Sequence, residues 1–596
     1  MSAPGAGPVE RRSRVSSLWR ERRARWTLPL VIILIIAGVA VVDHLGSRQI
    51  SQVDQPVIPP QVEATGGASI VHLPGPWDGF NPNTPAGASS STPSLLDAVL
   101  PSAYVINPKM VPVVNTDMLE SVEATATTPL TIQYVINPKA VWSDGVPVTA
   151  DDFIYAWQAQ KGDGLDTDGQ PIQMASTLGY RDVASVTGSH GGRTVTVVFT
   201  RPFADWRIMF DHMVPAHIAR KVGWNTGFAS FDPAVDLSAG PLLLASVSPT
   251  GTAELVRNPS WWGTPSVLGS ITVSAGTTDA GWIEPLATTN TAVSQPGRFT
   301  LTSLSSVSAL PNGQSSIHPS LAYLSLEFNV KSTVLSHVAA RQAVAHAIDR
   351  TVLLNRLFGM VDPELMVNQD HLAVAWQTSY AASTAAGEYA QVNLDATDSL
   401  LKSLGFARTM GTPYVDADGK PFTVRMAVEE GDPWIDEAAA GIASELKAAG
   451  ITIVVVPVAG TAGLATAMAA NGYDMALVTR TSGPYQSVTQ GWYSDGAGHR
   501  GAADAQNWSR FDDPQVDQLF VQAAQELNPV TGGATYAQID DQLWDQMVAL
   551  PLFGEPGLMA SGVQVANAAY NPSVDGVLWN VALWTRLKPA PPATHS

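Results

Sequence analysis

Short runs of alternating apolar and polar residues, rich in β-branched side chains, recur along the chain and predict strands of five to eight residues. The string ASIVHL begins such a run at Ala68, where we expect the globular part to start. The seven runs that follow occupy residues 130–136, 194–200, 271–275, 322–328, 422–428, 451–458 and 474–479.

Helical patterns lie between these runs. Thr149 precedes Asp151 and Asp152, which is typical of a capped helix with carboxylates in its first turn. Further helices are predicted over residues 338–357, 436–449 and 536–548. Because strands and helices alternate in several blocks, the pattern predicts α/β lobes rather than a sandwich or a propeller.

Two segments lack a regular period. Residues 43–61 are largely polar and contain three prolines, which is typical of a linker. Residues 275–320 are rich in Ser, Thr, Gly and Pro, and we expect an exposed connector there.

Length and composition narrow the class of protein. A single core stops growing at about 250–300 residues, so a chain of 596 residues should contain at least two. With 45% hydrophobic and 14% charged residues, the chain is neither a disordered nor a nucleic-acid-binding protein. The absence of cysteine excludes disulfides, thiolate metal sites and a cysteine nucleophile.

The charge is distributed unevenly around one apolar segment. Residues 1–25 hold seven arginines and two acids, a net charge of +5, and the rest of the chain carries −24. Between them, residues 26–42 are uncharged and just long enough to span a bilayer. Because arginines keep their flank cytoplasmic, the sequence predicts a single-pass signal anchor with the main body outside the cell membrane. A cleaved signal peptide, with small residues at Gly38 and Ala40, is the alternative.

No enzyme signature occurs in the chain. Nucleophile elbows, zinc-binding HExxH helices and phosphate-binding loops are all missing, and the histidines are scattered. Two D-x-D-G strings, beginning at Asp166 and Asp416, lack the remaining ligands of a calcium loop, so we interpret them as polar turns. We expect no catalytic residue, no metal and no cofactor; a hydrolase is the least favoured hypothesis.

Aromatic residues in polar surroundings supply the candidate site. Trp434 lies in EEGDPWIDE, Tyr485 in SGPYQS, and Trp492 and Tyr493 in TQGWYSDGAG. Rings beside acids and glycines suit a ligand cleft in which a ring stacks on the ligand. For each of these four rings, the alternative to ligand binding is a structural role in the packing between the lobes.

A family resemblance begins at Tyr134. The string YVINPKAVWSDGVPVTADDFIYAW (134–157) resembles the signature of the family 5 bacterial extracellular solute-binding proteins, the dipeptide- and oligopeptide-binding components of ABC importers. Further matching strings follow in order, among them RPFADW (201–206), VRNPSWWG (256–263), RQAVAHAIDR (341–350), NGYDMAL (471–477) and NWSRFDDPQVDQL (507–519). Composition is similar to that of the actinobacterial branch, which includes the mycobacterial LpqW-type lipoproteins.

The resemblance implies a two-lobed periplasmic-binding-protein clamshell with an additional subdomain, here preceded by the transmembrane helix. Ligand would bind between the lobes, which close by a hinge motion. By analogy, the predicted parts are lobe I (62–100, 203–315 and 555–590), the additional subdomain (101–202) and lobe II (316–554).

The resemblance also implies a function. We expect a binding protein for a peptide or other small solute that delivers its ligand to ABC permease subunits. Asp495 follows the GWY string and stands where peptide-binding members place an aspartate for the ligand's amine. The alternative is a non-transport regulator or scaffold of cell-envelope glycolipid assembly on the same fold.

Overall fold

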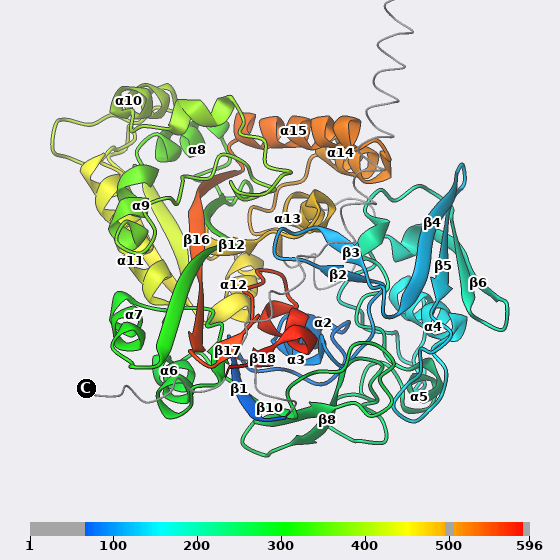
Figure 1. Ribbon diagram of the computed structural model, residues 1–596. Coiled ribbons are helices and arrows are strands. Elements are labelled where there is room, and N and C mark those ends of the chain that lie inside the picture. Colours follow the sequence, from blue (N-terminus) through cyan, green and yellow to red (C-terminus); the bar gives the residue numbers. More distant parts are fainter. Residues whose placement is uncertain (1–65, 495–505, 588–596) are drawn as a thin grey trace, which may run out of the picture. The chain divides into compact units, whose positions relative to one another are not determined.

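The computed structural model describes residues 66–494 and 506–587 (Figure 1). A ten-stranded mixed sheet runs through this part of the chain, in the order β14-β13-β15-β12-β16-β11-β1-β10-β9-β8. In that order the strands are Thr452–Val458, Thr423–Glu429, Met475–Thr481, Gly313–Phe328, Ala549–Gly562, Ala292–Ser294, Ala68–Leu73, Ser270–Ala275, Ala253–Arg257 and Leu242–Val247.

Two long antiparallel strands, β12 and β16, join the halves of this sheet. The first part of β12 pairs with the end of β16, and its last part, residues 322–328, lies between β16 and β15. The register between β12 and β16 shifts between Pro319 and Tyr323, where the chain passes from one half to the other. We call the half with β1 and β8–β11 lobe I and the half with β13–β15 lobe II. The predicted α/β class and two-lobed fold are thereby confirmed.

Helices cover both faces of lobe II. Met426 and Val428 of β13 are buried with α11 (Pro433–Ala448), whereas Ala427 faces α12 (Gly460–Ala469). Burial on both faces explains why residues 426–428 of β13 form a continuous apolar run. The other helices of this half are α8 (Val338–Ala345), α9 (Arg350–Phe358), α10 (Leu394–Ser403), α13 (Gln490–Tyr493), α14 (Pro514–Gln525) and α15 (Pro529–Asp545).

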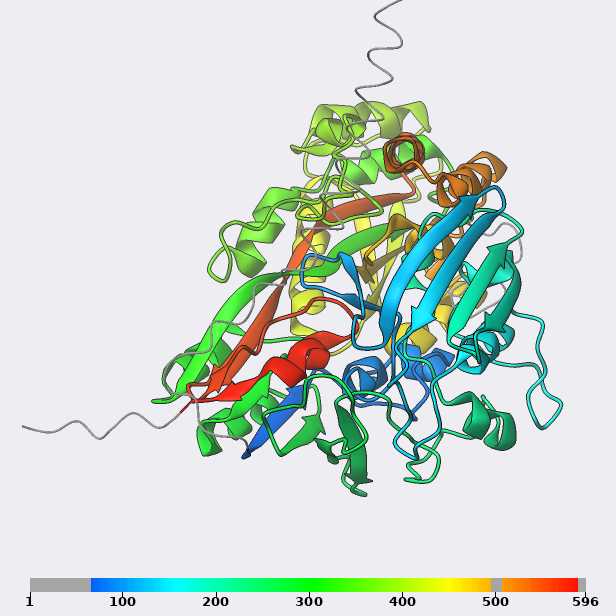
Figure 2. The same ribbon diagram turned by 45° about the vertical axis from the view of Figure 1, so that its right-hand side comes forward.

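A separate four-stranded antiparallel sheet has the order β4-β5-β7-β6 and lies beside the main sheet (Figure 2). Its strands are Leu119–Thr127, Leu130–Ile136, Thr194–Phe199 and Val183–Ser189. The remaining elements of lobe I and its surroundings are α2 (Pro85–Ala88), α3 (Thr92–Leu96), β2 (Tyr104–Ile106), β3 (Pro112–Val114), α4 (Ala150–Gln160), α5 (Ala216–Val222), α6 (Asp279–Thr288), α7 (Leu301–Ser308), β17 (Val565–Ala566) and β18 (Thr585–Arg586).

The signature string around residue 145 has a structural role. Thr149 and Asp152 form a capping box at the start of α4, and Asp152 also accepts a bond from the Ala216 amide at 3.0 Å. Asp144 bonds the His217 ring at 2.9 Å. The motif therefore fastens α4 to the segment that begins α5.

The single helix predicted over residues 338–357 is wrong, because the chain forms two helices there. Asp349 has extended backbone angles, and its carboxylate accepts a bond from the Val352 amide, so it caps α9. The buried Arg350 then donates to the carbonyls of Asn368 and Pro551. Aspartate favours a cap over a helix interior because its short side chain bonds nearby amides.

The exposed connector predicted over residues 275–320 is also wrong. This segment contains α6, β11, α7 and the start of β12, and it buries Trp282 and Phe299. Its serine and threonine content reflects helix caps: Thr278 caps α6, and Thr300 forms a capping box on α7.

The eight predicted strands all occur, although residues 322–328 are only the last part of β12. Both D-x-D-G strings form turns, in which Asp166 and Asp416 accept bonds from following backbone amides. Within residues 66–494 and 506–587, no helix has the length and apolar character needed to cross a membrane. The predicted anchor at 26–42 lies outside these residues, and the proposed domain boundaries remain predictions.

Candidate ligand-binding site

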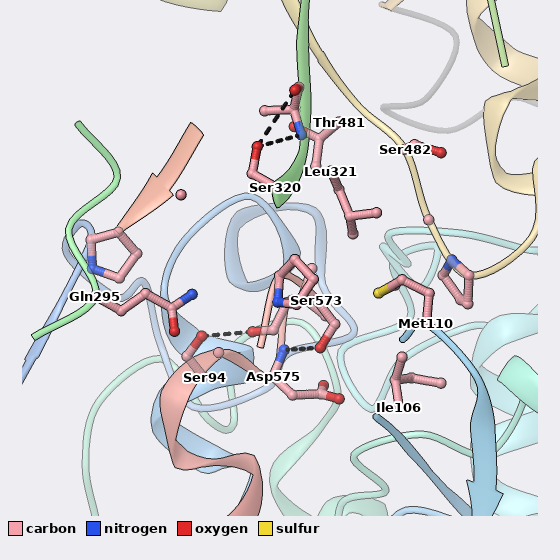
Figure 3. A pocket seen from close by; sticks show the side chains of 18 of the residues that line it. Ser94, Ile106, Met110, Gln295, Ser320, Leu321, Thr481, Ser482, Ser573 and Asp575 are labelled. Carbon is pink, nitrogen blue, oxygen red and sulfur yellow. Dashed lines mark hydrogen bonds between the residues drawn. The ribbon is translucent and has the colours of Figure 1, made fainter. Parts of the chain in front are cut away.

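A cavity of about 550 Å³ lies where β12 and β16 pass from lobe II to lobe I (Figure 3). Residues 320–322 of β12 and 555–557 of β16 contribute to its wall. The volume falls in the range of small-molecule sites. The rest of the wall comes from lobe I loops (90–94, 295–298 and 570–576), the lobe II loop 481–488, the segment 207–211 and residues of the β2–β3 hairpin.

Small residues and prolines dominate the wall, and two tyrosines supply its aromatic surface. The ring of Tyr570 stacks on His318 with centroids 4.7 Å apart, and burial raises the pKa of its hydroxyl. A Cβ on Gly557 would lie 2.0 Å from that hydroxyl, so glycine lets the ring approach β16. Tyr104 packs edge-on against Trp206.

Arg298 joins the two lobes at the edge of the cavity. Its Nε donates to Asp432 Oδ2 at 2.6 Å, and its Nη1 pairs with Glu555. Nη2 donates to the Thr479 hydroxyl at 3.1 Å, which in turn donates to Glu555 at 2.9 Å. The guanidinium also lies 4.7 Å from the ring centre of Trp434. Burial lowers the pKa of Arg298, but the two carboxylates reverse this effect and keep the group charged.

Arg207 supplies a second cation to the wall. Within the part of the chain that the structure describes, no carboxylate lies within 4.0 Å of its guanidinium. Burial raises the pKa values of Tyr104 and Tyr485, and nearby Arg207 opposes both shifts. Burial also raises the pKa of neighbouring Asp205 to about 6, although Ser487 and Arg207 act in the opposite direction.

One wall residue has an unpaired acceptor. Gln295 donates through Nε2 to the Asn571 carbonyl at 2.9 Å, whereas its buried Oε1 has no hydrogen-bond partner. Figure 3 places Gln295 at one side of the space, with Ser320 and Leu321 above and Asp575 below. A buried acceptor without a partner is costly, and this atom itself is not exposed to the cavity.

A sequence profile of the bacterial extracellular solute-binding proteins, family 5, middle region, matches residues 113–501, more than half of the chain. The chain belongs to this family. The resemblance seen in the sequence is thereby confirmed.

Individual relatives agree with this assignment. The oligopeptide-binding protein OppA of Mycobacterium tuberculosis is 29% identical over 81% of this chain and 78% of its own length. The probable monoacyl phosphatidylinositol tetramannoside-binding protein LpqW of the same species is 26% identical over 60% of this chain and 55% of its own length. The solved structure of the periplasmic EDTA-binding protein EppA superposes with a TM-score of 0.81 at 23% identity, covering 90% of this chain and all of EppA.

The aromatic candidates of this family 5 protein occupy different places. Trp434 lies in the first turn of α11, partly buried, with its ring against Arg298 of the wall. Tyr485 adjoins the wall residue Pro484 and the cation of Arg207. Trp492 and Tyr493 are buried in lobe II, where they flank Arg480. Asp495 lies outside the described residues.

The wall residues Tyr104, Arg207, Arg298 and Tyr570 were not predicted from sequence. They lie on four separate segments that only the folded sheet brings together. The string RPFADW, which precedes Arg207, carried a family signal, but nothing in it marks the arginine as a wall residue. Local patterns do not encode such long-range convergence.

Proposed function

We propose that this protein is an extracytoplasmic binding protein that captures a peptide-like solute with a free carboxylate and delivers it to an ABC permease. The observation that carries the proposal is the cavity at the crossing of β12 and β16, with walls from both lobes. Closure of the lobes would bury the ligand there. The relative named as oligopeptide-binding supports the solute class.

The carboxylate would bind at Arg207. Its guanidinium lines the cavity without a carboxylate within 4.0 Å among the described residues. Planar guanidinium groups match carboxylates in two-point hydrogen bonding, so Arg207 is suited to this end of a zwitterion.

The residues predicted from the sequence would have different roles in ligand binding. Tyr485 and Trp434 would hold Arg207 and Arg298 in place from behind the wall. Trp492 and Tyr493 would support lobe II through their packing. Asp495 is proposed as the partner of the ligand's amine, on the strength of its position after the GWY string.

Amidation of the ligand tests the role of Arg207. Short peptides with free C-termini should raise the melting temperature, and C-terminal amides should bind about 10–100-fold more weakly, since a hydrogen bond to a charged group contributes about 1.5–3 kcal/mol. Arg207→Met should remove this discrimination. Arg201→Met, at an exposed arginine paired with Asp182, is the matched control and should retain it. Equal binding of acid and amide by the natural protein would contradict the proposal.

The tether and the transport partner have separate tests. We propose that residues 26–42 remain in the mature protein as a membrane anchor, because seven arginines precede them. Mature protein from membranes should retain the N-terminus in mass spectrometry; loss of about 40 residues would indicate cleavage instead.

Permease and ATPase subunits should co-purify with the anchored protein. Their absence together with a lack of peptide binding would favour the regulator of envelope assembly.

A further inference from the structure

Four ionisable side chains converge behind one wall of the cavity. Asp97 follows α3, Asp211 and His212 lie a few residues after Arg207, and Asp575 precedes the short helix at residues 576–583. Asp211 and Asp575 line the cavity. One ligand atom from each of Asp97, His212 and Asp575 lies within 4.8 Å of the other two. Three distant parts of the chain therefore bring nitrogen and oxygen donors to one point.

The imidazole of His212 is held rigidly and has one nitrogen without a hydrogen-bond partner. Nδ1 lies 2.9 Å from Asp211 Oδ2, which fixes the ring's orientation. The backbone amide bonds the Ser102 hydroxyl at 2.9 Å, and the residue has a positive φ of 43°. Although only 2% of the side chain is exposed, Nε2 has no hydrogen-bond partner and lies 3.6 Å from Asp97 Oδ1.

Two other buried histidines have both ring nitrogens bonded, whereas Nδ1 of the buried His346 also lacks a hydrogen-bond partner. Both ring nitrogens of His371 have partners, Asp540 at 2.7 Å and the Ala549 carbonyl at 3.1 Å. Both nitrogens of His72 are likewise bonded. In residues 66–494 and 506–587, no second group of three His, Asp or Glu donors converges as the His212 group does.

The spacing of His212 and Asp97 agrees with a shared ion rather than with a direct hydrogen bond. Two ligands of a tetrahedral Zn²⁺, each about 2.1 Å from the metal, are about 3.4 Å apart. The 3.6 Å between His212 Nε2 and Asp97 Oδ1 is close to this value and too long for a hydrogen bond. A histidine whose second nitrogen bonds a carboxylate is the usual arrangement of a metal-binding imidazole.

We propose that Asp97, His212 Nε2 and Asp575 bind a divalent transition-metal ion of the Zn²⁺ type, with Asp211 as the residue that positions the imidazole. The imidazole selects against the hard cations Mg²⁺ and Ca²⁺, which prefer oxygen ligands. Three protein ligands leave a coordination position open, as in zinc sites that also bind a water or a substrate.

Zinc titration of the full chain tests the site without any solute, so its outcome is independent of the proposed function. After removal of metals with EDTA and desalting, calorimetry with ZnCl₂ should show one tight site that MgCl₂ and CaCl₂ do not occupy. Asp97→Asn and His212→Gln should each weaken Zn²⁺ binding at least tenfold. Asp211→Asn should weaken it about 10–100-fold, and Asp211→Glu should recover part of the loss.

His217→Gln is the matched control, because His217 also pairs with an aspartate but is partly exposed. It should bind Zn²⁺ as the natural protein does. Anomalous diffraction from Zn²⁺-loaded crystals of the unaltered chain covers the case of unstable variants and should place the ion between Asp97, His212 and Asp575. An ion elsewhere, no tight binding, or full binding by Asp97→Asn would overturn the proposal.

Discussion

The Nε of Arg298 lies 2.6 Å from Oδ2 of Asp432, and this contact links lobe I to the first turn of α11 in lobe II. The other oxygen of Asp432 caps α11 by accepting bonds from the amides of Trp434 and Ile435. One carboxylate thus fixes both the start of a lobe II helix and a cation at the edge of the cavity. Glu555, which is 2% exposed, is the second partner of this cation.

Replacement of Arg298 by Met should lower the free energy of unfolding by about 3 kcal/mol, because Glu555 is left buried without a countercharge. Urea denaturation measures this change. Arg356→Met is the control, since the Arg356–Glu437 pair is exposed and should contribute under about 1 kcal/mol. Equal losses in the two variants would contradict a special role for the inter-lobe pair.

Asp152 and Asp151 are adjacent in sequence but differ in what they contact. Asp152→Ala leaves the amides of Thr149 and Ala216 without their acceptor and should cost about 2–4 kcal/mol of stability. Asp151 is exposed, so Asp151→Ala should change stability by less than about 0.5 kcal/mol. Thermal and urea unfolding of both variants measure the difference, and similar losses would show that the buried carboxylate is dispensable.

The sequence predicted elements well wherever a local pattern has a local cause. The strand at Leu130–Ile136 and the capped helix that starts after Thr149 follow from alternation and from side-chain caps. The break at Asp349 was missed because an apolar periodicity continues across a residue that prefers to cap. At Asp349, the preference of aspartate for a helix cap outweighs the amphipathic pattern that would continue the helix.

Fewer residues of the candidate site could be predicted from the sequence. Trp492 stands in a polar string, yet it is buried against Tyr323 and Arg480 of lobe II. Arg207 and Tyr570 gave no signal, because their place in the wall depends on the crossing of β12 and β16. Side chains from segments hundreds of residues apart meet only through sheet topology, which local composition does not contain.

Asp205 should make stability depend on pH between about 4 and 6. Burial raises its pKa from 3.8 to about 6, so the folded state holds the proton more tightly than the unfolded state does. The resulting stabilisation is present at low pH and is lost as pH rises through 6, by about 3 kcal/mol in total.

Asp205→Asn removes this dependence. Relative to the natural protein, the variant should gain about 1–3 kcal/mol of stability at about pH 7.5 and little at about pH 4, as measured by urea unfolding at both values. Asp163→Asn removes a carboxylate that is 71% exposed and serves as the control. A difference between Asp205→Asn and the natural protein that stays constant with pH would assign the pH dependence to other groups.

Substitution of Trp434 should mainly lower the affinity for ligand, whereas substitution of Trp492 should mainly lower the stability of the fold. Trp434→Ala removes the ring that holds Arg298 in the cavity wall through a cation–π contact of about 1 kcal/mol. Because the wall is then held less firmly, the variant should bind a peptide ligand about 3–10-fold more weakly. Trp492→Ala removes a buried ring and its bond to Gln506, so it should cost about 3–5 kcal/mol of stability. Calorimetry below the unfolding transition gives the affinities, and urea denaturation gives the stabilities. Because Trp492 does not line the cavity, its folded variant should bind within about twofold of the natural protein. A larger loss of affinity in Trp492→Ala than in Trp434→Ala would place the ligand deeper in lobe II, beside Arg480.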